Sequence, residues 1–547
     1  MPTNCSPWAE PGSLSRRCIG LLVAAGVALA AGGAQARGRG SLLAAQEVAA
    51  HAAERVAPER LPLVLEKAGV WPRHEDATSI PAPWVFPRVA KCDPAANLRG
   101  WPPGRDAPPF PFHEGQTFGM AQLEALRDYL PPFIWEHREK FFFQGMQLVI
   151  GRCFNDYSPP GFYRAATAAH AGEPKLTSSG GLVDYRAGLP FPPDRIEPTD
   201  PEAGLKWAWN FELRYQGAGF WGDFRTSDMV GRGGRAEPFV GEIFRALTAF
   251  RSERRRKGYK APGAPGKHWV AGGVMREPFD ARHYSWRQYR ALENMTEAGR
   301  TDDLHAYLPN FRRVRRLPGS GVEGIYMPSF SVGVVKPMVV AGLGGGIGGS
   351  GGGAAGVGGA VAGSITTKRS GFEGIEMRPL LYSIRVLGVQ DILTPINAST
   401  PAFPVDPQRD FGPWGLSFAN DRWDLRRAVV LQGRAKEERG GDRVVRFVQY
   451  VDLQTLAPLY YASWDHRDEL IDVGMHVGRW SEEREGYPAW PDAPERPIRV
   501  IDTVGAAFAN ISVEGGWRRE SWEIISTPPP DQEFKRLLSV GNLTRRR

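Results

Sequence analysis

The stretch from Asp421 to Asp465 constrains the fold most, because it predicts three consecutive antiparallel strands. The first runs from about Arg422 to Arg434, the second from Arg443 to Val451, and the third from Leu459 to Trp464. Asp and Thr side chains bond to nearby backbone amides in turns, so Asp452 and Thr455 predict a tight turn between the last two strands. The stretch is therefore predicted to be a meander, and nothing in it resembles an active site.

The second strand of this meander alternates in polarity. Two sets of side chains are expected to point to opposite faces: Val445, Phe447, Gln449 and Val451 to one, and Val444, Arg446, Val448 and Tyr450 to the other. Such alternation predicts a sheet with one face more buried than the other.

A few helices are expected beside the strands. Helix is predicted over 41–69 and 117–143, from Val240 to Phe250, and from Asp468 to Trp480. A helix or turn that opens at Asp200 is expected to lead into a strand over 211–216. The abundance of Gly (65) and Pro (47) favours many turns and long loops. The predicted class is α+β, β-rich.

The N-terminus resembles an export signal. Arg16 and Arg17 precede a short apolar run, and Ala34-Gln35-Ala36 supplies a small-residue cleavage pattern. Cleavage after Ala36 is predicted, by either the general secretory or the twin-arginine route. The expected division is a signal peptide at 1–36, a helix and Pro-rich extended segment at 37–115, and one large domain at 116–547.

Two cysteines remain after this cleavage, Cys92 and Cys153. Exported proteins meet an oxidising compartment, so a disulfide between them is predicted. It would stabilise the fold by roughly 3–4 kcal/mol in the chain-entropy model. Two separate buried thiols are the alternative.

The motifs of common enzyme and cofactor sites are missing or misplaced. There is no P-loop and no His-Glu-x-x-His, and the ten His show no metal-ligand spacing. Gly344, Gly346 and Gly349 imitate a dinucleotide motif, but so glycine-rich a stretch makes a poor helix. Residues 341–364 are instead predicted to be a flexible insertion. We expect no enzyme activity, no cofactor and no metal.

A basic run at 251–260 is a weak candidate for nucleic-acid binding, because no recognised fold surrounds it in an exported chain. A solvated or membrane-facing loop fits it better. The net charge of +8 is compatible with anionic surfaces but equally with an ordinary solvated surface. No nucleic-acid partner is expected.

The sequence feature that favours ligand binding is a set of aromatic residues. Eight large aromatic residues lie in or beside the predicted strands: Trp207, Trp209, Phe211, Trp423, Tyr450, Tyr460, Tyr461 and Trp464. A curved sheet lined in this way can hold an apolar ligand, so these residues are the candidate ligand contacts. The alternative for each is an ordinary core position.

Several segments together resemble one family of exported bacterial proteins, the domain-of-unknown-function 1329 family, which is loosely described as outer-membrane lipoprotein-sorting-like. The resemblance extends from about residue 60 to 525. The segments are Leu182–Pro192, Ala203–Asn210, Ala306–Arg316, Gly371–Leu381, Pro395–Ala398, Asp421–Trp423, and Val451-Asp452 with Thr455 and Pro458–Tyr461. No catalytic residues come with this resemblance.

The meander is also similar to the periplasmic lipoprotein carriers. That likeness implies a half-open β-barrel, a strongly curved antiparallel sheet with helices as a lid over an apolar cavity. It implies a periplasmic location, in association with the outer membrane, and lipid traffic with an outer-membrane protein and an inner-membrane exporter as partners. The predicted function is a carrier for a lipid, acyl chain or lipoprotein. An envelope adaptor that binds a partner protein is the alternative.

Overall fold

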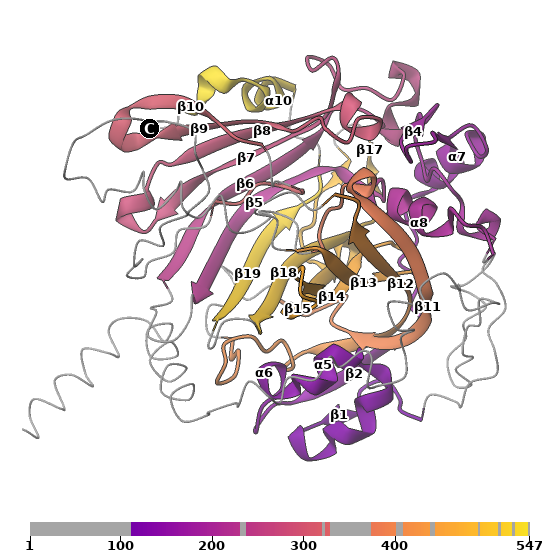
Figure 1. Cartoon of the computed structure of the whole chain (residues 1–547). Helices are drawn as coiled ribbons and strands as arrows, with labels where there is room; N and C mark the ends of the chain where they lie inside the picture. Colours follow the sequence, from indigo (N-terminus) through magenta and orange to yellow (C-terminus); the bar gives the residue numbers. More distant parts are fainter. Residues whose placement is uncertain are drawn as a thin grey trace, which may run out of the picture.

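A single large sheet dominates the computed structural model (Figure 1). The structure describes residues 111–197, 199–229, 237–319, 323–328, 374–400, 409–437, 444–490, 493–511, 516–527 and 531–544. The predicted signal peptide at 1–36, nearly all of segment 37–115 and the Gly-rich run 341–364 lie outside these residues. The domain boundaries stay a prediction.

The sheet has fifteen strands in the order β1-β2-β12-β13-β14-β15-β18-β19-β5-β6-β7-β8-β9-β10, and β11 also pairs with β12. Its strands are β1 Thr117–Phe118, β2 Leu148–Cys153, β5 Gln216–Met229, β6 Glu237–Leu247, β7 Lys267–Glu277, β8 Ser285–Ala291, β9 Asp303–Leu308, β10 Arg313–Leu317, β11 Tyr382–Thr394, β12 Arg422–Ala435, β13 Arg446–Asp452, β14 Pro458–Trp464, β15 Leu470–Trp480, β18 Ile501–Asn510 and β19 Gly516–Ile525. Because β2 pairs parallel with β12, the sheet is mixed rather than wholly antiparallel as predicted.

Helices are few and short. The α-helices of the described residues are α5 Pro132–Glu136, α6 Arg138–Phe141, α7 Gly161–Ala169, α8 Ala203–Glu212 and α10 Asp531–Leu538. The 3-10 helices are η3 Met120–Tyr129, η4 Pro193–Arg195, η5 Ser252–Lys257, η6 Phe279–Ala281, η7 Leu292–Met295, η8 Pro309–Phe311, η9 Pro379–Leu381, η10 Ser481–Glu483 and η11 Val540–Thr544. Two small hairpins stand apart from the sheet, β3 Lys175–Leu176 with β4 Leu182–Val183, and β16 Ala489–Trp490 with β17 Ala493–Pro497.

The predicted meander is confirmed as β12, β13 and β14, which pair in succession. Its second turn forms as expected, because the Thr455 amide and hydroxyl both donate to the Asp452 carboxylate at 2.8 Å. The unequal burial of its two faces is wrong. Every residue of β13 and β14 is buried, since other elements pack on both sides of these strands.

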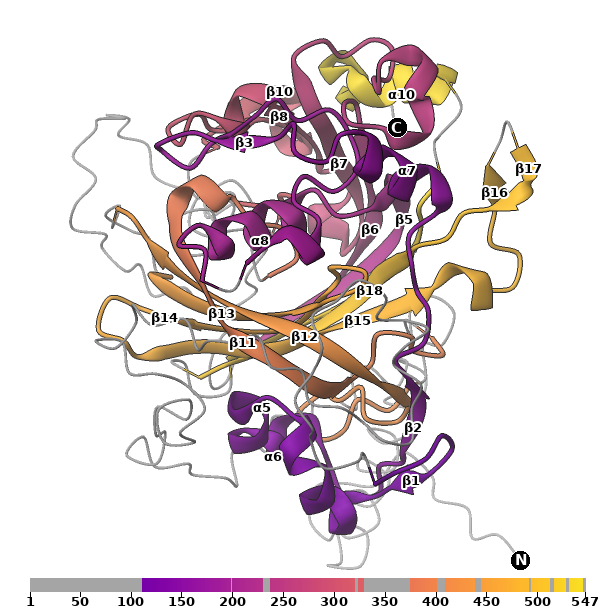
Figure 2. The ribbon, with the colours of Figure 1, turned by 90° about the vertical axis from the view of Figure 1, so that its right-hand side faces the viewer.

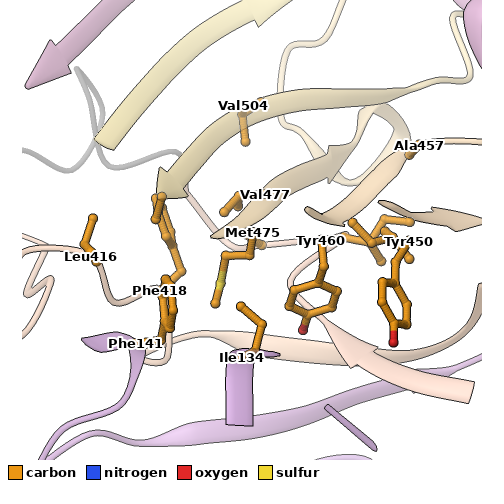
Figure 3. Close-up of a cluster of buried hydrophobic side chains, with 14 of the residues drawn as sticks. Ile134, Phe141, Leu416, Phe418, Tyr450, Ala457, Tyr460, Met475, Val477 and Val504 are labelled. Carbon is orange, nitrogen blue, oxygen red and sulfur yellow. The ribbon is translucent and has the colours of Figure 1, made fainter. Parts of the chain in front are cut away.

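Two layers enclose the meander (Figure 2). On one side α8 packs against a cluster that includes Phe447, Val451 and Tyr461. On the other side α5 and α6 cover a cluster that includes Tyr450 and Tyr460. Figure 3 shows side chains of this second cluster from both layers, with Ile134 and Phe141 on the helical side and Tyr460 and Met475 on the sheet.

Three predictions of secondary structure are wrong. The predicted helix over 240–250 falls largely in strand β6, and the one over 468–480 falls in strand β15. Strand β15 is buried on both faces and so lacks the alternating pattern, which makes the spacing of its apolar residues resemble that of a helix. Phe211 belongs to α8, which continues to Glu212, rather than to the predicted strand over 211–216.

Candidate functional site

One face of the sheet can be followed across its strands from the pairing register. Phe508 lies opposite Arg518, Trp522 opposite Phe224, and Ile243 opposite Gly273. Directly opposite residues point to the same side of a sheet, and residues two apart on one strand do so as well. Phe508 packs in the same cluster as α8. These positions therefore share the side of the sheet on which α8 packs, which we call the α8 face.

A cavity lies on the α8 face, lined by residues of β5, β6, β18 and β19. Its volume is about 80 Å³. Its apolar wall includes Phe220, Ile243, Ile325, Met327, Trp522 and Ile524. A concave, mostly apolar wall with a few polar groups is typical of small-molecule sites.

Segments outside the strands also line this cavity, among them two that are far apart in the sequence. The described residues stop at Pro328 and resume at Gly374. Met327 and Ile375, next to these two points, both line the cavity. Segments from distant parts of the sequence therefore complete its wall.

The polar part of the cavity wall is built from β18 and β19. The Asp502 carboxylate accepts hydrogen bonds from the Arg484 guanidinium at 2.6 Å and the Tyr487 hydroxyl at 2.7 Å. Burial raises the pKa of Asp502, although Arg484 opposes this shift. On β19 the lining residues Arg518 and Glu520 form an ion pair. Since Trp522 and Ile524 follow on the same face, β19 presents a charged end and an apolar end to the cavity.

A buried ionic network adjoins the cavity and holds α8 to the strands. Glu376 pairs with Arg245 of β6, and its carboxylate lies 3.9 Å from Arg214, which lines the cavity. Glu212 of α8 lies 3.2 Å from Arg290 of β8 and accepts the Met377 amide at 3.1 Å. These contacts tie α8 and the segment after Gly374 to the strands of the α8 face.

Burial and the neighbouring Glu376 carboxylate raise the pKa of Glu212 to about 8. Burial also lowers the pKa of Arg214 to about 10. Both shifts follow from the removal of charged groups from water. The network connects α8 to the strands and places charged groups at the edge of the cavity.

The eight predicted ligand residues are all buried, but they divide among three clusters. Trp207, Phe211 and Tyr461 pack together on the α8 face, and Trp209 packs in the smaller cluster that includes Leu182. The other four, Trp423, Tyr450, Tyr460 and Trp464, belong to the cluster that α5 and α6 cover. None of the eight lines the cavity. Their contact with a ligand stays a prediction.

The cavity wall is formed by residues that the sequence reasoning missed. Ile243 and Ile524 come from strands almost three hundred residues apart, so composition could not bring them together. A local signal existed in β19, where Arg518, Glu520, Trp522 and Ile524 stand at every second position. This alternation from charged to apolar residues indicates one strand face with two environments.

The described residues also bear on the predicted disulfide, on metal binding and on membrane-spanning helices. Cys153 is disulfide-bonded, but Cys92 lies outside the described residues, so their pairing stays a prediction. No group of three or more His, Cys, Asp or Glu among the described residues could hold a metal ion. No helix of the described part has the length and apolarity needed to cross a membrane.

A second hollow lies on the opposite face of the sheet, beside the C-terminal helices α10 and η11. It has a volume of about 350 Å³ and is lined by charged residues such as Asp223, Glu242, Arg287 and Glu523, together with Trp221 and Leu537. Charged residues line both hollows, among them Arg214, Arg518 and Glu520 in the cavity on the α8 face. More apolar side chains line that cavity, however, and a hydrophobic ligand binds by covering apolar surface. The cavity on the α8 face is therefore the stronger candidate.

Residues 122–326 match the model of DUF1329, described as a protein of unknown function. The predicted family is confirmed over this part of the chain. The match includes strands β5 and β6, which supply part of the cavity wall. No curated protein matches the chain.

Three solved structures are similar at low identity. A DUF1329 family protein from Desulfovibrio piger is 14% identical with a TM-score of 0.34, and the match covers 60% of this chain and 93% of that one. A putative outer membrane lipoprotein-sorting protein domain from Vibrio parahaemolyticus is 12% identical with a TM-score of 0.35, covering 63% and 100%. A LolA superfamily protein from Nitrosomonas europaea is 10% identical with a TM-score of 0.29, covering 61% and 96%. Similarities this weak do not transfer a ligand.

Proposed function

We propose that this protein is a non-enzymatic periplasmic carrier that binds the apolar part of a lipid, an acyl chain or a lipoprotein in the cavity on the α8 face. The observation that carries the proposal is the cavity wall itself, in which Ile243, Trp522 and Ile524 meet Ile325, Met327 and Ile375 from outside the strands. In this proposal the sheet is a half-open barrel, and α8 with the segment after Gly374 covers its concave side.

Burial of a hydrocarbon chain supplies the affinity. Each CH₂ group that leaves water contributes roughly 0.8 kcal/mol, so a few buried methylenes give useful binding without any specific polar contact. The charged end of β19, Arg518 and Glu520, would lie nearer the polar part of such a ligand. An outer-membrane protein and an inner-membrane exporter as partners stay predictions from the resemblance.

The test is native mass spectrometry of the purified protein with lipid extraction, followed by binding of a fluorescent fatty acid. We expect a co-purifying hydrophobic molecule in the natural protein. Ile375→Trp places a larger side chain in the cavity and should weaken probe binding by about tenfold, which corresponds to about 1.4 kcal/mol.

Val314→Trp is the matched control, because Val314 lies on strand β10 and does not line the cavity. This variant should bind the probe like the natural protein, and circular dichroism should show both variants folded. A natural protein that carries no lipid and binds no fatty-acid probe would contradict the carrier and favour the adaptor.

A further inference from the structure

The most exposed large apolar side chains of the described residues lie at one end of the sheet. Phe279 is 85% exposed in η6, which joins β7 to β8, and Phe311 is 58% exposed in η8, which joins β9 to β10. Ser285 at the start of β8 lies opposite Tyr307 near the end of β9. Both connections therefore project from the same end of the sheet, which is on the left in Figure 1.

Arginines flank both of these phenylalanines. Arg282 follows Phe279, and Arg312 and Arg313 follow Phe311, all with exposed side chains. Within the part of the chain that the structure describes, none of these three arginines forms an ion pair. In the sequence Glu277 and Asp280 flank Phe279, and Asp303 pairs with Arg316 further along β10. Among the described residues next to the two rings, three arginines thus stand against two acidic residues, which leaves an excess of positive charge.

We propose that this end of the sheet docks on the surface of an anionic lipid bilayer. Aromatic rings insert at the boundary between headgroups and acyl chains, and arginines beside them meet the negative headgroups. A protein partner would more often offer carboxylates and cover the rings in a packed core, whereas two single rings on separate turns suit a fluid surface. The proposal is independent of the carrier function, because Phe279 and Phe311 do not line the cavity.

The opposite end of the sheet gives a comparison within the same molecule. There η5 joins β6 to β7 and exposes Arg255, Arg256 and Lys257, the basic run singled out in the sequence. Its aromatic neighbours Phe250 and Tyr259 are only partly exposed, and the Tyr259 hydroxyl bonds to His170 at 2.9 Å. This end carries positive charge but no exposed aromatic rings. It therefore serves as a control that distinguishes electrostatic attraction to anionic lipids from docking by inserted rings.

The experiment is co-sedimentation of the purified protein with vesicles of phosphatidylcholine alone, or with about a third of phosphatidylglycerol. We expect binding to the anionic vesicles only. The double variants Phe279→Ser with Phe311→Ser, and Arg312→Gln with Arg313→Gln, should each weaken the partitioning by about tenfold or more. The control Arg255→Gln with Arg256→Gln removes the same charge from the other end and should change it little.

Three outcomes would overturn the proposal: no preference for anionic vesicles, full binding by both variants of the proposed docking end, or an equal loss in the η5 control. Thermal unfolding of each variant shows whether the fold is kept, which we expect because all the altered side chains are exposed. A carrier variant such as Ile375→Trp should retain vesicle binding, so failure of one proposal is distinguishable from failure of the other.

Discussion

At the scale of single residues, the most unusual feature is the burial of charge beside the cavity. Glu212, Arg245, Arg290 and Glu376 are all at most 4% exposed. Charges that leave water must be paired, and removal of one partner from such a pair costs about 3–5 kcal/mol. The network therefore makes the position of α8 sensitive to the protonation of Glu212.

The raised pKa of Glu212 predicts a dependence of stability on pH. A carboxyl whose pKa lies higher in the folded protein stabilises the fold fully below its ordinary value of 4.5, and this contribution is lost as the pH rises to about 8. The side chain of the variant Glu212→Gln cannot ionise, so the variant does not lose this contribution. The free energy of unfolding of the variant minus that of the natural protein should therefore increase from pH 4.5 to pH 8, by at most about 1.4 kcal/mol per pH unit.

Urea unfolding at several pH values measures this difference. Glu202→Gln, at the exposed start of the same helix, serves as the control and should show no such trend. A difference for Glu212→Gln that stays constant from pH 4.5 to 8 would mean that Glu212 is ionised in the folded protein throughout.

At the scale of elements, α8 is fixed by a close approach to β11. A methyl group added at Gly204 would lie 2.6 Å from the Cα atom of Arg385 and would also meet the Ile384 carbonyl. Backbone cannot give way as a flexible side chain can, so only glycine lets the helix lie this close to the strand. The helix thus depends on one small residue in its first turn.

Gly204→Ala should therefore destabilise the protein by about 1–3 kcal/mol, the usual cost of overpacking a filled core. Gly161→Ala in α7 is the matched control, because no atom lies within 4 Å of its added methyl group. The control should be neutral or slightly stabilising, since alanine favours helices over glycine by up to about 1 kcal/mol. Thermal denaturation compares the two, and equal melting temperatures would show that α8 can move away from β11.

At the scale of the whole molecule, one sheet unites segments from residue 117 to residue 525. The central pairings β19 with β5 and β2 with β12 join parts of the chain that are nearly three hundred residues apart. Such pairings close large loops and cannot form from local sequence preferences alone. The cavity arises at these junctions, because its wall takes residues from both halves of the chain.

The Gly-rich run is expected to stand outside this assembly. Deletion of residues 341–364 leaves 329–340 and 365–373 to join Pro328 to Gly374, and the fold should be retained because a glycine-rich insertion supplies little core. The melting temperature and the far-UV circular dichroism spectrum should match those of the natural protein. Loss of cooperative unfolding would refute the prediction that this run is an insertion.

The sequence by itself determined the meander, the β-rich class and the family resemblance that is confirmed over residues 122–326. Strands β12 to β14 follow one another in the chain, so alternation and turn residues specify them locally. Only the tertiary structure decided that β6 and β15 are strands, that both faces of the meander are buried, and that the cavity lies among β5, β6, β18 and β19. The physical reason is that burial on both faces removes the alternating pattern in β15, and that pairing between distant strands places side chains together which no local sequence connects.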